Sequence, residues 1–308
     1  MTILPPPAVI QRVLDTISTI ANLLTLLISL SLLCIIIYQL IRSNSIYRKE
    51  MLKDMSIRLS MNTHCLLIIR SIFQFFDIDL NTIKRDYLSI QEFNNSFRCR
   101  FRGYLLLSIH NCLYWSYTIQ AIFRFIRVIF PHYIYLFQSK IRFCILIFIQ
   151  FFFGFISIFP IFIGFNDIYL LPNEPYCTAS FNELTSLTYM PILAFGLPLS
   201  TIVVCYLCIT WKIRRITTII RPYQQRNRRD FIVIHRMILL ITILSMVSLP
   251  LFIDLFIHLA KGYIDPYMNS IGWVSSSINA VILVISLPFI NPKLYELLKR
   301  KSNIVQVQ

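Results

Sequence analysis

The chain has 308 residues, of which 56% are hydrophobic and only 14% are charged, and its formal net charge is +15. Average soluble chains carry roughly 25% charged residues, so this composition argues against a cytosolic enzyme and against a disordered chain. The basic residues stand singly or in short clusters at the ends of long apolar runs. Orientation in a bilayer explains that placement better than nucleic-acid binding, so we expect a membrane protein that contacts lipids and no nucleic acid.

Seven segments are long and apolar enough to cross about 30 Å of hydrocarbon, which takes about 20 helical residues. The expected helices cover residues 14–41, 55–77, 99–130, 141–165, 184–213, 230–260 and 267–292. The second contains Arg70, which is costly in hydrocarbon and therefore either faces the bundle or snorkels towards head groups. The predicted fold is all-α, a seven-transmembrane helix bundle in which residues 1–308 form a single domain.

The distribution of lysine and arginine between these helices predicts the orientation of the chain. One set of connections, together with the C-terminal tail, holds 19 of these residues, and the other set holds seven. By the positive-inside rule the amino terminus is outside and the carboxyl terminus is cytoplasmic.

Two of the eight cysteines, Cys99 and Cys177, lie outside the apolar spans and on the predicted outer side. Disulfides persist in an oxidising compartment, so we expect these two to pair; the alternative is two unpaired thiols. The sequence Asn94-Asn95-Ser96 is an acceptor sequon on the same side, which predicts glycosylation of Asn94.

Several residues in and after the third expected helix stand at characteristic distances from one another along the sequence. The spacings are Cys99 to Arg124 (25 positions), Pro198 to Tyr206 (eight), Asp230 to Pro250 (twenty) and the run Asn291-Pro292-Lys293-Leu294-Tyr295. With seven helices, this set resembles the rhodopsin-like (class A) G-protein-coupled receptors, in a divergent form. The resemblance implies a plasma-membrane receptor that passes binding of an extracellular ligand to a cytoplasmic heterotrimeric G protein. It implies no enzyme activity and no cofactor.

The resemblance also implies an activation switch made of Arg124, Asp230, Tyr206, Asn291, Pro292 and Tyr295. An arginine near the inner interface is stabilised by a carboxylate on another helix, and an ion pair that can break acts as a switch. Arg124 could instead be a simple basic anchor, and Asp230 could pair with Arg229. Phe123 and Phe125 replace the acid and the tyrosine that usually flank this arginine in the family.

The sequence narrows the ligand class in two ways. No lysine lies between Pro266 and Pro292, so a retinal Schiff base is excluded. Leu106 occupies the position of the aspartate that binds amines in related receptors, so a peptide or lipid-like ligand is favoured. By family spacing its pocket would be formed by Leu106, His110, Asn111, Phe252 and Leu255.

The remaining expectations concern the predicted cytoplasmic face. Arg127, Arg226, Arg228 and Arg229 would contact the G protein, although basic loops also serve as anchors on anionic lipids. A surface helix over residues 293–301 would place its leucines on the membrane. The competing interpretation is a seven-helix transporter or channel, which would require several ionisable groups inside the membrane.

Overall fold

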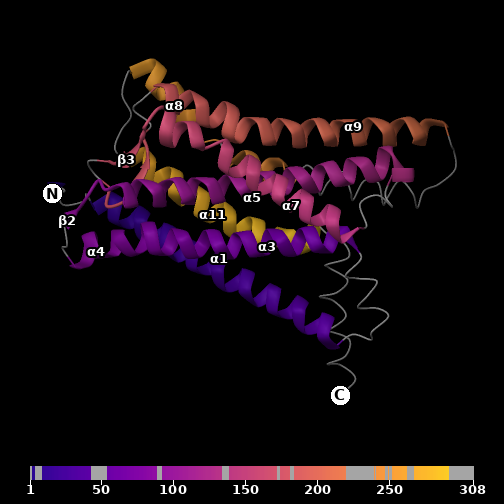
Figure 1. Cartoon of the computed structure of the whole chain (residues 1–308), viewed down its shortest axis with the longest axis horizontal. Coiled ribbons are helices and arrows are strands. Elements are labelled where there is room, and N and C mark those ends of the chain that lie inside the picture. Colours follow the sequence, from indigo (N-terminus) through magenta and orange to yellow (C-terminus); the bar gives the residue numbers. More distant parts are fainter. Residues whose placement is uncertain are drawn as a thin grey trace.

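The computed structural model describes residues 2–3, 9–42, 54–88, 92–133, 139–171, 174–180, 184–219, 239, 241–246, 249, 252–261 and 267–290. These residues form long helices that run roughly side by side, with short strands gathered at one end (Figure 1). The α-helices are α1 Val9–Arg42, α3 Met55–Gln74, α4 Leu80–Leu88, α5 Phe97–Ile129, α7 Lys140–Ile156, α8 Leu184–Tyr189, α9 Leu197–Ile219 and α11 Tyr267–Ile290. Short π-helical segments adjoin some of them, η1 Phe75–Asp79, η3 Pro160–Gly164 and η4 Met190–Gly196, and a 3₁₀ turn, η2 Pro131–Tyr133, follows α5.

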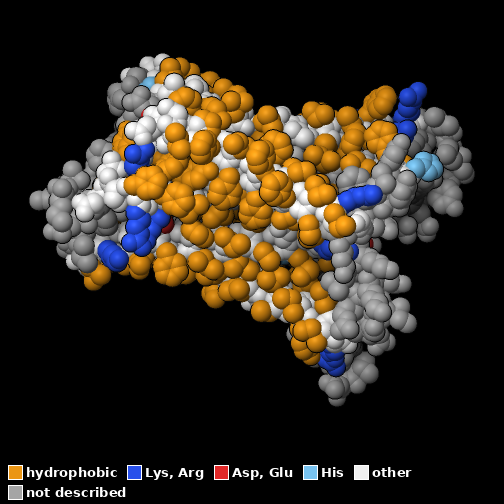
Figure 2. All heavy atoms as spheres, in the orientation of Figure 1, with side chains coloured by type: hydrophobic (Ala, Val, Ile, Leu, Met, Phe, Trp, Pro, Cys, Tyr) orange, Lys and Arg blue, Asp and Glu red, His pale blue; other side chains and the backbone are white. Residues whose placement is uncertain are grey.

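Within the described ranges, four helices are long and apolar enough to cross a membrane: Val9–Arg42, Ile141–Gly164, Leu184–Lys212 and Met268–Phe289. Hydrophobic side chains cover the middle of the face seen in Figure 2, and lysines and arginines gather towards the two ends. This division matches a slab of hydrocarbon bounded by two polar interfaces. The chain is therefore a multi-pass membrane protein, and its described part is all-α apart from the short strands.

The second and third expected helices are present as α3 and α5, and both bury polar side chains. Thr63, His64 and Gln74 of α3 and Asn111 and Gln120 of α5 are all buried. These side chains point inward, where other helices rather than lipid supply their contacts. The sixth expected helix is described only in pieces, which are helical, over residues 239, 241–246, 249 and 252–260. The predicted surface helix 293–301 lies outside the described residues.

The second expected helix is longer than the apolar run indicated. The sequence ended it near residue 77, where acidic residues begin, but the helical path continues through η1 and α4 to Leu88. Asp77 and Asp79 are buried rather than placed at a surface end. Asp79 accepts a hydrogen bond of 2.7 Å from Asn22 of α1, which explains why the acid is tolerated inside the bundle.

The helix α5 lies at the centre of the bundle and packs against α3, α7 and α9, while α1 packs against α3 and α11. Gly154 permits the close approach of α7, because a Cβ there would overlap Cys112 of α5. Small residues at such contacts let membrane helices approach closely enough for extensive van der Waals contact.

Two antiparallel strand pairs lie at the end of the bundle where α5 begins. One pairs β1 (Thr2–Ile3) with β2 (Glu92–Phe93), and the other pairs β3 (Ile168–Leu170) with β4 (Cys177–Ala179) in the register Leu170 to Cys177. The β3–β4 hairpin rests directly on α5, because a Cβ at Gly103 would overlap the carbonyl oxygen of Cys177. The hairpin therefore covers this end of the helix bundle.

Candidate functional site

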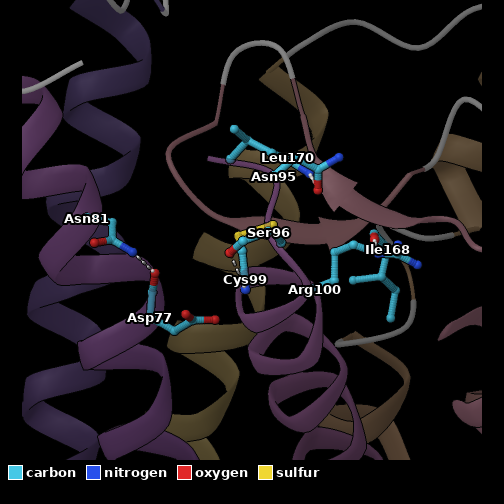
Figure 3. The surroundings of a disulfide bond; sticks show 9 residues. Asp77, Asn81, Asn95, Ser96, Cys99, Arg100, Ile168 and Leu170 are labelled. Carbon is cyan, nitrogen blue, oxygen red and sulfur yellow. Dashed lines mark hydrogen bonds between the residues drawn. A yellow bond between two sulfur atoms is a disulfide. The ribbon is translucent and has the colours of Figure 1, made fainter. Parts of the chain in front are cut away.

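The predicted disulfide between Cys99 and Cys177 is confirmed, and it ties the start of α5 to β4 (Figure 3). Ser96 caps the same helix by accepting a hydrogen bond from the Cys99 amide at 3.3 Å. Arg100 adds a second tie, since its Nε donates to the Ile168 carbonyl at 2.9 Å and its Nη2 donates to the Asn166 side chain. Asn94 is exposed just before this cap. The hairpin is thus fixed to α5 by a covalent bond and by a charged side chain.

At the opposite end of α5, two of the predicted switch residues meet. Arg124 donates from Nη1 to the hydroxyl oxygen of Tyr206 on α9 at 3.2 Å. Arg127, one turn further along, is exposed. The other switch and partner residues, Asp230, Asn291, Pro292, Tyr295, Arg226, Arg228 and Arg229, lie outside the described residues.

The predicted ligand-pocket residues divide into groups. Leu106 is buried against Ile78 and Tyr176, and Trp273 of α11 packs on the same cluster. His110 lies one turn further along the same face of α5 and is only half-buried. Asn111 instead donates to the Gly154 carbonyl of α7 at 3.2 Å.

The last two predicted pocket residues, Phe252 and Leu255, are half-buried in the segment 252–261. Asp254, which the sequence analysis did not single out, is buried beside them in the same segment.

Arg70 faces the bundle, which decides between the two alternatives left open by the sequence. Only 1% of the surface of Arg70 is exposed. Its Nε donates to His110 Nδ1 at 3.1 Å, and its Nη2 donates to Ser276 Oγ of α11 at 2.7 Å. Arg70 therefore joins α3, α5 and α11 through two hydrogen bonds.

A second buried charged group lies nearer the hairpin and was missed by the sequence analysis. Arg85 of α4 contacts Asp15 of α1 at 2.7 Å and its neighbour Asp86 at 2.7 Å, and it lies 3.9 Å from Glu174 in the hairpin loop. All four side chains are at most 10% exposed. We call this group the Arg85 cluster. Its signal in the sequence was Asp15, an acid inside the expected first helix that needs a partner when it is buried.

Within the Arg85 cluster, the carboxyl group of Glu174 has a pKa that differs from its ordinary value. Burial raises the pKa of its carboxyl to about 7; the negative charge of Asp15 adds to this rise, and Arg85 opposes it. The 3.9 Å distance from Arg85 is too long for the direct hydrogen bond that would offset burial.

We expect the stability of the protein to fall as the pH rises from about 4.5 to about 7, because the folded state holds the Glu174 proton more tightly than the unfolded state does. Glu174→Gln should flatten that part of the profile, since the amide does not titrate. Thermal unfolding of the purified chain across this pH range provides the measurement. A slope that stays the same in Glu174→Gln would contradict the assignment.

Polar contacts also continue between the two arginine sites. Gln74 donates to Ser277 Oγ at 2.8 Å, and that oxygen lies 3.1 Å from Ser18 Oγ of α1. Asn22 donates to Asp79 and, at 3.1 Å, to the Ser71 carbonyl. The interfaces of α1, α3 and α11 are thus polar over several turns, which is unusual for lipid-embedded helices and indicates a functional interior.

Comparisons with known proteins supply no family assignment. No model of a protein family matches the chain, and no curated protein matches its sequence significantly.

Proposed function

We propose that this chain is a seven-helix receptor of the rhodopsin-like type, in the plasma membrane, with its amino terminus outside and its carboxyl terminus in the cytoplasm. It would transmit binding of an extracellular ligand to a heterotrimeric G protein. The observation that carries the proposal is the pairing at both ends of α5. The disulfide fixes one end, and 25 residues further along Arg124 contacts Tyr206.

The distance between these two pairings suits transmission across a membrane. At 1.5 Å per residue, 25 helical residues span about 38 Å, which exceeds the hydrocarbon thickness. Figure 1 shows α5 running the length of the bundle, with the strands at one end. A ligand held near the hairpin could therefore shift the position of a helix whose other end lies at the cytoplasmic interface, by favouring one of two pre-existing states.

Arg124 is proposed as the switch, with two alternative partners. In the structure it donates to Tyr206, and in the resting state Asp230 would take it instead. Phe123 supplies no carboxylate beside Arg124. A partner on another helix would therefore have more effect on the position of the Arg124 side chain. Asn291, Pro292 and Tyr295 would form the bendable inner end of the seventh helix.

The experiment changes the two partners separately. Asp230→Asn should raise ligand-free nucleotide exchange on a co-expressed G protein about tenfold, because losing the restraint shifts the equilibrium by about 1.4 kcal/mol. Tyr206→Phe should lower exchange several-fold, since a hydrogen bond to a charged group contributes about 1 kcal/mol or more. The measurement is exchange at matched surface expression.

The chain offers a matched control for the tyrosine variant. Arg42 donates to the Tyr38 hydroxyl at 3.2 Å, on the exposed surface of α1. Tyr38→Phe removes the same chemical contact and should leave exchange unchanged. If Asp230→Asn lowers exchange, or if Tyr206→Phe and Tyr38→Phe behave alike, the proposed switch is wrong.

The remaining contacts follow from this orientation. Arg127, Arg226, Arg228 and Arg229 would meet the G protein, and residues 293–301 would lie along the inner lipid surface. The exposed Asn94 would be glycosylated on the outer side. The ligand would lie near Leu106, His110, Phe252 and Leu255.

A transporter or channel is the second candidate, and one observation favours it. Arg70, Asp79, Asp15 and Arg85 are all buried within the bundle, which gives more interior ionisable groups than the sequence indicated. Such groups mark ion and proton pathways in transport proteins. Ion flux into vesicles that contain the purified chain without any G protein would favour transport over the receptor.

A further inference from the structure

We infer that Arg70 is the binding site for the carboxylate of a small amphipathic ligand whose body is apolar or aromatic. This inference deepens the proposed receptor function, on which it rests for the place of ligand entry, and it adds the chemical class of the ligand. It differs from the family-based pocket prediction, which did not include Arg70.

The hydrogen bonds of Arg70 leave part of its guanidinium unused. A guanidinium carries five N–H donors in a planar fork. Nε donates to His110 and Nη2 donates to Ser276, but Nη1 is buried and has no hydrogen-bond partner among the residues that the structure describes. His110 accepts through Nδ1 and Ser276 is a hydroxyl, so both partners are uncharged.

The charge of Arg70 also lacks a close counter-ion within the described ranges. In the described part of the chain, all three ion pairs within 4 Å involve Arg85, which contacts three carboxylates. Asp79 attracts Arg70 electrostatically, but no such pair joins them, and the Asp79 carboxylate is held by Asn22. A buried charge without a partner is strongly unfavourable, so the ligand-free site is poised for an anion.

The geometry favours a carboxylate, because its two oxygens match the planar fork of an arginine. Of the two hydrogen-bonded residues, His110 is half-buried whereas Arg70 is fully buried, so a ligand would reach Arg70 from the His110 side. The His110 ring lies 5.9 Å from the rings of Tyr114 and Phe195. One turn towards the hairpin, Leu106 packs with Trp273.

These surroundings define the rest of the ligand. Leu106 and His110 share a face of α5, and Trp273 and Ser276 share a face of α11, because residues three or four apart lie together on a helix. The two faces form a polar layer at Arg70 beneath an apolar and aromatic layer. A ligand with one carboxylate and an apolar body would complement both layers.

The test compares three probes of the same shape and different charge: phenylbutyrate, phenylbutyramide and phenylbutylamine. Each is titrated against the purified full chain in lipid nanodiscs, and thermal unfolding is recorded without any G protein. The carboxylate should stabilise the protein at a concentration about tenfold lower than the amide, which corresponds to about 1.4 kcal/mol. The amine should bind more weakly still.

Variants then assign the preference to Arg70. Arg70→Gln should abolish the preference for the carboxylate over the amide, and Arg70→Lys should retain part of it. Arg102→Gln is the control for non-specific attraction, because Arg102 is exposed near the start of α5; this variant should retain the full preference. Without ligand, Arg70→Gln should unfold no earlier than the unmodified protein, since it removes an unpaired buried charge.

Three results would overturn the inference: equal stabilisation by carboxylate and amide, a preference that survives Arg70→Gln, or a large loss of ligand-free stability in that variant. The last would show that Arg70 is a structural hydrogen-bonding group. The receptor proposal is judged separately by nucleotide exchange. A chain that prefers the carboxylate but never stimulates exchange would refute the receptor and leave the anion site intact.

Discussion

Replacing Arg85 by methionine is expected to lower the free energy of unfolding by about 3 to 5 kcal/mol, which corresponds to a fall of roughly 10 °C in the unfolding midpoint. Arg85 is the shared partner of Asp15, Asp86 and Glu174, and all four side chains are buried. Methionine would fill similar space but would leave these carboxylates without their cation. Thermal unfolding of the purified chain in detergent, at a pH above 7, is the measurement.

The neighbouring Lys84 provides the matched control. It is half-buried on the same helix, and it forms none of the ion pairs found in the described residues. Lys84→Met should therefore change stability by less than about 0.5 kcal/mol.

A second change tests the mechanism of the loss. Adding Asp15→Asn to Arg85→Met should restore part of the lost stability, because it removes one of the uncompensated charges. Equal effects of Arg85→Met and Lys84→Met, or no recovery in the double variant, would show that the Arg85 cluster does not stabilise the fold.

The Arg85 cluster also shows what a single sequence can and cannot reveal. Asp15 is an acid near the start of the expected first helix, but its position alone led to no predicted partner. Its partner Arg85 is 70 positions away, and nothing in the spacing says that α1 and α4 face one another. From the sequence alone, Arg85 therefore belongs to a loop between the second and third helices.

Other features were predictable because they follow from local chemistry or from paired spacings. The apolar runs located α1, α7, α9 and α11, since length and hydropathy are sufficient for spanning helices. The disulfide followed from two cysteines that stood apart from the apolar spans. The contact of Arg124 with Tyr206 was not predicted, because the resemblance named both residues but gave Asp230 as the partner of Arg124.

The end of the second helix and the β3–β4 hairpin were not predictable. Asp77 and Asp79 looked like the end of a membrane segment, because an unpaired acid in hydrocarbon is unfavourable. Asn22 on a different helix changes that balance by donating to Asp79. The hairpin has strands of only three residues, and its position depends on the disulfide and on Gly103 rather than on strand propensity.

The role of the disulfide is tested by the double change Cys99→Ser and Cys177→Ser, which should destabilise the protein by about 4 kcal/mol. The bond closes a loop between residues 78 positions apart, and by the chain-entropy estimate a loop of that length contributes about 4.5 kcal/mol. The contacts of Arg100 with the hairpin remain, so the variant should fold at low temperature and unfold early. The shift in the unfolding midpoint, with and without reductant, is measured.

Cys144→Ser is the matched control, because Cys144 is a free and exposed thiol, and its loss should leave the midpoint unchanged. Reductant should lower the midpoint of the unmodified protein and of Cys144→Ser by equal amounts, and it should not affect the double serine variant, in which the bond is already missing. If reductant lowers all three midpoints equally, its effect does not come from the Cys99–Cys177 bond. If the double variant unfolds within about 1 kcal/mol of the unmodified protein, the hairpin is held by Arg100 and by packing on Gly103, and the covalent tie is dispensable for stability.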